Sequence, residues 1–126
     1  MLIWILFALA LHLVHIYLPA ALFLPAEGLL THGGSRDELP KPSRAVGRAR
    51  RALANYQENL PIFLALAFLA YLVEGTDMNG AIIGAEIFIL ARVAYLPLYM
   101  ISIPFTRSIA YSIGLVGNVL MLIAVL

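Results

Sequence analysis

The sequence predicts an all-α integral membrane protein built as a bundle of four helices. Hydrophobic residues make up 63% of the 126 residues and charged residues 12%, compared with about 25% charged residues in soluble domains. The apolar residues are concentrated in runs that are about long enough to cross a bilayer, at 1–24, 52–73, 80–103 and 107–126. A chain of this length has room for one domain, so we expect 1–126 to form a single unit.

The first apolar run, residues 1–24, could be a signal peptide or a transmembrane helix. A signal peptide begins with a basic segment and ends at a small-residue cleavage site. This run contains no Lys or Arg and exceeds the usual apolar core of a signal peptide. We therefore expect a transmembrane helix that is kinked at Pro19 and ends near Pro25.

Two histidines of this run, His12 and His15, lie three residues apart on one helical face. A metal site would need further ligands, and His32 lies in the following loop, beyond the reach of both. We therefore expect hydrogen-bonded histidines inside the bundle and no metal site.

The polar connection at 27–50 determines the expected topology. Six of the eight Lys and Arg residues lie between Arg36 and Arg51, whereas the turn after the second run has none. The positive-inside rule then places loop 27–50 and the Arg107 end in the cytoplasm, with both termini on the opposite side. A basic cluster beside membrane spans indicates topology and anionic lipid headgroups, so no nucleic acid partner is expected.

The second run carries polar side chains into the membrane. Steps of four and three residues place Arg51, Asn55 and Glu58 within roughly 60° of one another on one face. Glu58 lies roughly 10 Å deeper along the helix than Arg51. A carboxylate at that depth is costly, so it is expected to face protein or a pocket and to have a partner.

The third run offers such a partner. Arg92, Tyr95 and Tyr99 follow one another at intervals of three and four residues on one stripe. The simplest arrangement is an ion pair between Glu58 and Arg92 inside the bundle. Glu86 is the alternative partner for Arg92, unless it lies near the outer end of its helix and reaches water.

The ion pair would not explain Arg48, Arg51 and Arg107, which are expected to gather at one membrane face. Several guanidiniums around a half-buried pocket suit a small ligand with two carboxylates. Tyr95, Tyr99 and Asn55 could bond a peptide-like ligand. The chain contains no Cys, so any thiol belongs to the ligand, and a neighbouring arginine would lower the pKa of that thiol. The alternative is that the polar groups serve only to hold the helices together.

These motifs resemble one membrane family over nearly the whole chain. The pattern is Arg51-x-x-x-Asn55-x-x-Glu58-x-x-Pro61-x-Phe63, then Ala91-Arg92-x-x-Tyr95-x-x-x-Tyr99, then Arg107-Ser108. It resembles the MAPEG family, the membrane-associated proteins of eicosanoid and glutathione metabolism, and within it a bacterial-type microsomal glutathione transferase. The resemblance implies a four-helix bundle that assembles as a homotrimer and binds glutathione between subunits near the cytoplasmic face.

The resemblance also implies roles for individual residues. Arg51, Asn55, Glu58, Tyr95 and Tyr99 match glutathione-contacting positions, and Arg92 matches the internal partner of the glutamate. Arg92, and Arg48 from the local cluster of arginines, are counted with them among the expected glutathione-binding residues. Arg107 matches the arginine that activates the thiol, with Ser108 as a weaker catalytic candidate beside it. One departure is Asn59, because several glutathione-using members carry an aromatic residue directly after the glutamate.

The expected function is therefore a membrane-embedded, glutathione-dependent transferase or peroxidase acting on lipophilic electrophiles or lipid hydroperoxides that enter from the bilayer. The alternative is a non-catalytic lipid-binding or scaffolding trimer, because the family also contains a non-catalytic member. A small transporter or channel subunit is supported only by the two histidines and the intramembrane charges.

Overall fold

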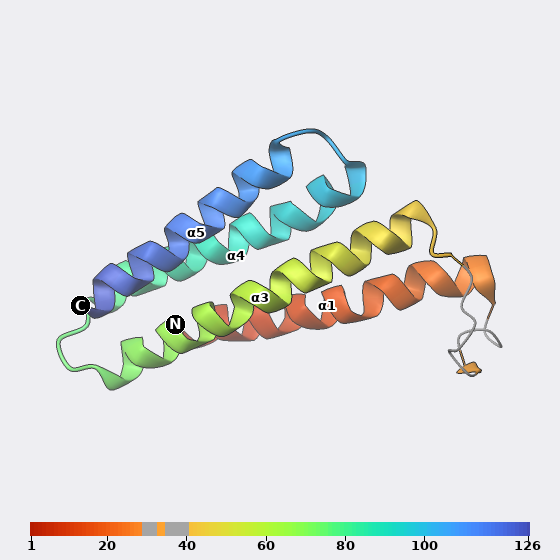
Figure 1. Cartoon of the computed structure of the whole chain (residues 1–126). Coiled ribbons are helices and arrows are strands. Elements are labelled where there is room, and N and C mark those ends of the chain that lie inside the picture. The colour runs from red at the N-terminus through yellow and green to blue at the C-terminus, as the bar shows by residue number, and fades with distance from the viewer. Residues whose placement is uncertain (29–32, 35–40) are drawn as a thin grey trace.

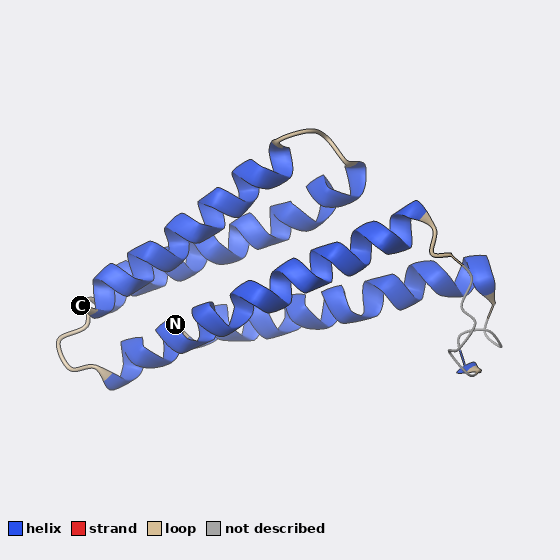
Figure 2. Cartoon of the chain, viewed as in Figure 1, coloured by secondary structure: helices blue, strands red, loops and turns tan. Residues whose placement is uncertain are grey.

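The computed structural model of the chain is a bundle of long helices (Figure 1), and it describes residues 1–28, 33–34 and 41–126. Short loops join the helices within these residues (Figure 2). The helices are α1 (Leu2–Glu27), α3 (Arg44–Leu72), α4 (Met78–Ile101) and α5 (Thr106–Val125). The all-α class and the four long helices that the sequence predicts are thus confirmed, with bounds that differ in detail.

The first helix is longer than expected. Pro19 and Pro25 both lie inside α1, which continues to Glu27. The helix ends at Gly28, which has a φ of 83°, a conformation that glycine adopts readily. The Gly28 N–H donates to the Leu24 carbonyl at 3.0 Å. Pro25 therefore precedes the end of the helix without causing it.

The second long helix begins at Arg44, ahead of the membrane span expected at 52–73. Ser43 caps it, because the Ser43 Oγ accepts the Val46 N–H at 3.3 Å. Alanines between the arginines favour the helical conformation. Arg44, Arg48, Arg50 and Arg51 therefore lie on a helix, with fixed angular positions.

A tight connection joins α4 to α5. Ser102 ends α4 at a φ of 64°, and Phe105 precedes α5 at a φ of 65°. This left-handed conformation is unusual for a bulky side chain such as that of Phe105, and it allows the chain to reverse within a few residues. The reversal places the start of α5 beside the end of α4 (Figure 1).

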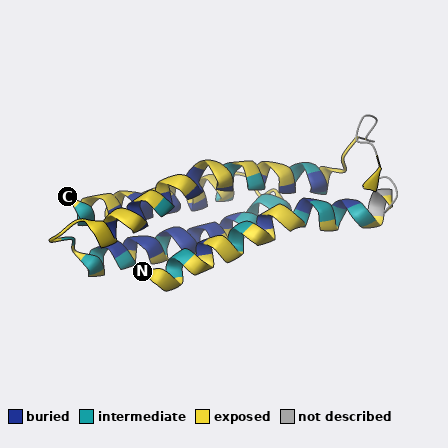
Figure 3. Cartoon of the chain, turned by 90° about the horizontal axis from the view of Figure 1, so that it is seen from below, coloured by how far each residue is buried: buried dark blue, intermediate teal, exposed yellow. Residues whose placement is uncertain are grey.

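Helices α4 and α5 approach each other closely where two glycines, Gly84 and Gly117, face each other. A Cβ on Gly117 would lie 2.6 Å from the Gly84 carbonyl oxygen, so only glycine allows this separation. Beside this contact, the rings of Phe63 and Phe88 stack at 4.6 Å between α3 and α4. Buried side chains line the inner faces of the helices and exposed ones the outer faces (Figure 3).

Among the described residues, three helices are long and apolar enough to cross a membrane: α1 over Leu2–Pro25, α4 and α5. The first half of α3 is rich in Arg, Asn, Gln and Glu, which lowers the mean hydropathy of that helix. The crossing by α3 at 52–73 therefore stays a prediction from the apolar run of the sequence. The start of α3, the end of α4 and the start of α5 lie at one end of the bundle (Figure 1).

Candidate functional site

Tyr99 brings two arginines together at this end of the bundle. The Arg51 Nε donates to the Tyr99 hydroxyl at 3.1 Å, and its Cζ lies 6.0 Å from the centre of the tyrosine ring. The Arg107 Cζ lies 5.2 Å from the same centre. Residues from α3, α4 and α5 therefore meet here, and both arginines are exposed. In the part of the chain that the structure describes, neither guanidinium is paired with a carboxylate.

Tyr95 forms the floor of this cluster. It is buried against Ala52 and Ala110, and its ring contacts that of Tyr99 with centroids 5.5 Å apart. The two alanines matter because they let α3 and α5 approach this tyrosine closely. Tyr95 therefore supports Tyr99 from below, and the Tyr99 ring contacts the arginines above.

Arg92 is fully buried one turn deeper. Its Nη1 donates to the Asn55 Oδ1 at 2.8 Å, and its Cζ lies 5.1–5.7 Å from the ring centres of Phe88, Tyr95 and Tyr111. Its Nε and Nη2 have no hydrogen-bond partner among the described residues. Cation–π contacts and one amide therefore stabilise this buried charge.

The prediction that Glu58 and Arg92 form an ion pair inside the bundle is wrong for the single chain. Glu58 is exposed, and Asn55 is the residue that meets Arg92. The three-residue step from Asn55 turns Glu58 by about 60°, which carries its side chain past the edge of the buried face. Glu86, the alternative partner, is exposed as well.

Arg48 lies on the same face but has a different contact. Its Nη1 donates to the Met100 carbonyl at 2.7 Å, close to the last residues of α4. Carbonyls at a helix C-terminus lack intrahelical partners and carry partial negative charge, so a guanidinium there is favourable. In the structure Arg48 ties the start of α3 to the end of α4.

Asn59 lies at the position where the sequence departs from the family pattern, and its side chain bonds the backbone of its own helix. It is buried, and its Nδ2 donates to the Asn55 carbonyl at 2.8 Å. The bond holds Asn59 against the residue that contacts Arg92. An aromatic side chain would not form this bond.

The two histidines of α1 flank Tyr56 of α3. The Tyr56 ring stacks on His15 at 4.6 Å and on His12 at 5.8 Å, and the Tyr56 hydroxyl donates to the Ala8 carbonyl at 2.8 Å. His15 is buried, and its Nδ1 bonds the Leu11 carbonyl at 2.8 Å, as expected. The expectation is not met for His12, whose buried Nδ1 has no hydrogen-bond partner among the described residues. His32 lies outside the described residues.

Ser108, the second catalytic candidate, lies beside Arg107 at the α4–α5 turn. Both line a pocket of about 390 Å³, whose other lining residues are Ser102, Ile103, Pro104 and Phe105. The pocket is therefore built largely from the turn with the two left-handed residues. Its polar groups come from Arg107 and the serines.

Some residues around the site were missed by sequence reasoning. Tyr111 covers Arg92, and Gly114 gives that guanidinium room, since a Cβ there would lie 3.3 Å from the Arg92 Nε. Both belong to an (i, i+3) or (i, i+4) series that starts at Arg107, a signal that could have found them. Asn118, buried with both amide atoms unpartnered among the described residues, continues this series.

Comparisons with known proteins agree with the motifs. The MAPEG family model matches residues 1–126, the whole chain. No curated protein matches the chain. The match covers every residue of the cluster around Tyr99 and Arg92, on a helical bundle with spans apolar enough for a membrane. The chain is therefore a member of the MAPEG family.

Proposed function

We propose that the chain is a membrane-embedded, glutathione-dependent transferase or peroxidase that acts on lipophilic electrophiles or hydroperoxides. The observation that carries the proposal is the pair of exposed guanidiniums, Arg51 and Arg107, which meet at Tyr99 without a carboxylate among the described residues. Such a pair suits a ligand that brings its own negative charges, and glutathione has two carboxylates and a thiol. Members of this family use glutathione.

The residues divide into holding and activating groups. Arg51 holds a carboxylate of the tripeptide, and Tyr99 and Tyr95 line the site beside it. Asn55 has its Oδ1 engaged by Arg92, which leaves its amide N–H₂ to meet the peptide. Arg107 stabilises the thiolate, and Ser108 next to it is the weaker candidate for a hydroxyl donor.

Arg48 and Arg92 act at a distance in this proposal, although the sequence suggested both as ligand contacts. Arg48 positions the ends of two helices through the Met100 carbonyl, and Arg92 orients the Asn55 side chain. Glu58 remains a proposed contact of glutathione, supplied from the outer edge of α3, where its exposure leaves it free to meet a ligand.

We further propose a homotrimer with the site near a subunit boundary. Gln57 and Glu58 are adjacent, polar and exposed on the membrane half of α3, and Glu86 is exposed on α4. Polar groups at such depth are costly against lipid, which favours their burial against another copy. Loop 27–50 and Arg107 face the cytoplasm in this proposal, and both termini face the other side.

The substitution Arg107→Ala tests the proposal. With purified protein in detergent, glutathione is expected to produce a saturable ultraviolet thiolate signal, and the variant should lose about 90% or more of it at neutral pH. An arginine within reach shifts a pKa by about 1–3 units, so its loss raises the pKa of the bound thiol. The signal should return as the pH is raised, because a higher pKa moves ionisation to higher pH.

Arg50→Ala is the matched control, since Arg50 is an exposed arginine of α3 that the structure does not place in the cluster. Its thiolate signal should equal that of the wild type. An intact wild-type protein that gives no thiolate signal would refute the proposal and support the lipid-binding or scaffolding alternative.

Arg48→Ala is expected to separate structure from ligand binding. Losing a charged hydrogen bond at the α4 terminus should cost about 1–2 kcal/mol of stability and lower the unfolding temperature in detergent. The thiolate signal at saturating glutathione should persist, because Arg48 bonds the Met100 carbonyl. A stable variant that binds no glutathione would instead make Arg48 a direct ligand contact.

A further inference from the structure

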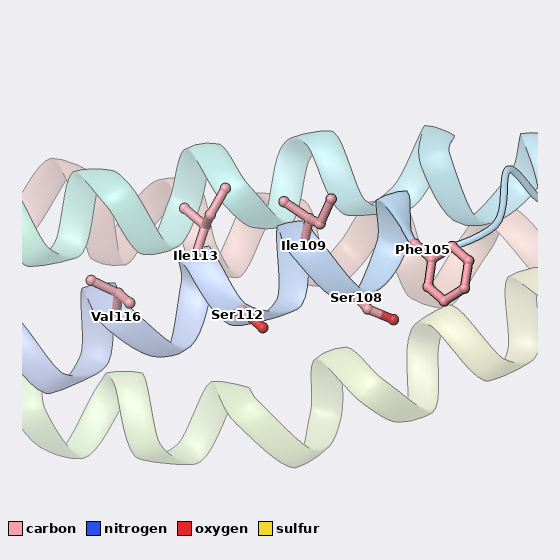
Figure 4. Close-up of a pocket in the computed structure, with 6 residues that line it drawn as sticks. All are labelled: Phe105, Ser108, Ile109, Ser112, Ile113 and Val116. Carbon is pink, nitrogen blue, oxygen red and sulfur yellow. The ribbon is translucent and has the colours of Figure 1, made fainter.

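The inner face of α5 carries one buried polar side chain in the depth of the bundle. Figure 4 shows Ser112, Ile113 and Val116 on the outer side of this helix, along a surface pocket. The other side carries the buried residues of α5, which are Ala110, Gly114, Gly117, Asn118 and Met121. Asn118 is 4% exposed, and neither of its two amide atoms has a hydrogen-bond partner within the described residues.

Two N–H groups of Arg92 lie close to this inner face. A Cβ on Gly114 would lie 3.3 Å from the Arg92 Nε and 3.5 Å from its Nη2, so both nitrogens lie near the same point on α5. Together they form one edge of the planar guanidinium, a fork of donors. Neither nitrogen has a hydrogen-bond partner among the described residues, and the bond to Asn55 uses the third nitrogen, Nη1.

Asn118 and the Arg92 fork converge on one turn of α5. Asn118 follows Gly114 by four residues, about 6 Å along the helix axis. Side chains on a helix lean towards its N-terminus, so Asn118 leans back towards Gly114. Because α4 and α5 run in opposite directions (Figure 1), the same rule tilts Arg92 towards the turn of α5 that contains Asn118.

The two groups are complementary, yet no direct hydrogen bond joins them. Arg92 has only donors, and the Asn118 Oδ1 is an acceptor. One water molecule spans up to about 6 Å, since each of its hydrogen bonds is about 2.9 Å long. It can accept both N–H groups of the fork and donate to the amide oxygen, which makes the three bonds that are usual for buried water. An anion would suit the fork but would face the lone pairs of that oxygen, so water is the better match.

We propose that an ordered water molecule inside the bundle bridges the Arg92 fork to the Asn118 Oδ1, and that Asn118 is thereby a positioning residue for the proposed glutathione site. The bridge holds the guanidinium from the α5 side, and the Nη1 of the same guanidinium orients the Asn55 side chain. Asn118 therefore acts on glutathione through Arg92 and Asn55, without touching it. The inference rests on the proposed glutathione activity.

Asn118→Leu removes the acceptor and keeps a side chain of similar volume. With the detergent-solubilised full chain, the glutathione concentration that gives half of the maximal thiolate signal should rise by about three- to tenfold, the value of one hydrogen bond. The maximal signal should match that of the wild type, because Arg107 still stabilises the thiolate. Asn118→Asp keeps an acceptor oxygen for the fork, so its half-saturating concentration should stay within about twofold of the wild-type value.

Met121→Leu is the matched control for packing. Met121 is buried on the same face of α5, and this swap conserves volume in an apolar side chain. Its half-saturating glutathione concentration should equal that of the wild type, and a rise equal to that of Asn118→Leu would overturn the proposal. A role of Asn118 in packing alone would change the unfolding temperature of Asn118→Leu without changing its half-saturating concentration, which would also overturn the proposal.

Gly114→Ala tests the water molecule itself. The new Cβ would lie beside the fork, 3.3 Å from the Arg92 Nε, and should exclude the water and weaken glutathione binding by a similar factor. Because Gly114→Ala and Asn118→Leu break the same bridge, the double variant should bind glutathione no more weakly than the weaker single variant. Effects that multiply in the double variant would show that the two residues act separately, and would overturn the bridge.

The wild-type thiolate signal separates this inference from the proposed function. A normal wild-type signal with an unchanged half-saturating concentration in Asn118→Leu would overturn the role of Asn118 only. The absence of any thiolate signal in the wild type would overturn both proposals.

Discussion

Replacing Gly117 with alanine is expected to destabilise the protein by about 2–4 kcal/mol, which should greatly lower its unfolding temperature in detergent. The new Cβ would lie 2.6 Å from the Gly84 carbonyl oxygen and 2.7 Å from the Phe88 nitrogen. Both are backbone atoms, so no side-chain rotation relieves the overlap, and α4 and α5 must separate. The separation also removes packing around the buried Phe88 and Met121.

Gly47→Ala is the matched control for this effect. Gly47 lies inside α3, and a Cβ there would meet only the Arg51 Nη1 at 3.5 Å, an ordinary contact. Alanine is the better helix former, so this variant should be more stable than the wild type by about 0.5–1 kcal/mol. Equal destabilisation by the two substitutions would show that the α4–α5 contact is looser than the structure has it.

Asn55→Leu is expected to cost about 2–5 kcal/mol in the absence of glutathione. Asn55 supplies the one hydrogen bond of the Arg92 guanidinium that the described residues show, and its loss leaves a buried cation held by aromatic rings alone. Removing one partner of a buried charged pair is costly because the charge that remains is desolvated. Thermal unfolding in detergent measures the loss.

The double variant Asn55→Leu with Arg92→Met should recover stability to within about 1 kcal/mol of the wild type. Both partners are then apolar and of similar volume, so no unpaired charge remains in the bundle. Failure of Arg92→Met to rescue Asn55→Leu would mean that another group, such as Glu58 of a neighbouring copy, balances the charge of Arg92. The thiolate signal of the rescued protein would show whether Asn55 also contacts glutathione.

The sequence alone was sufficient for the class of protein and for the side chains that gather around Tyr99. Apolar runs longer than a bilayer is thick have few stable arrangements other than a helical bundle, because every backbone group must be bonded internally. The spacing of Arg92, Tyr95 and Tyr99 assigned them to one face, since a helix converts spacing into direction without reference to any neighbour. The meeting of Arg51, Tyr99 and Arg107 follows from helices that start or end at the same end of the bundle.

Only the tertiary structure decided which polar groups meet. Asn55 and Glu58 both belong to the predicted stripe, yet this stripe lies at the edge of the buried face. The rotation of α3 about its own axis points Asn55 inwards and Glu58 outwards. Local spacing does not determine this rotation. The rotation depends on how Phe63 packs on Phe88, and on how closely Gly84 and Gly117 let α4 and α5 approach. The partner of Arg92 was therefore a property of the packed bundle and could not be obtained from any one of its helices.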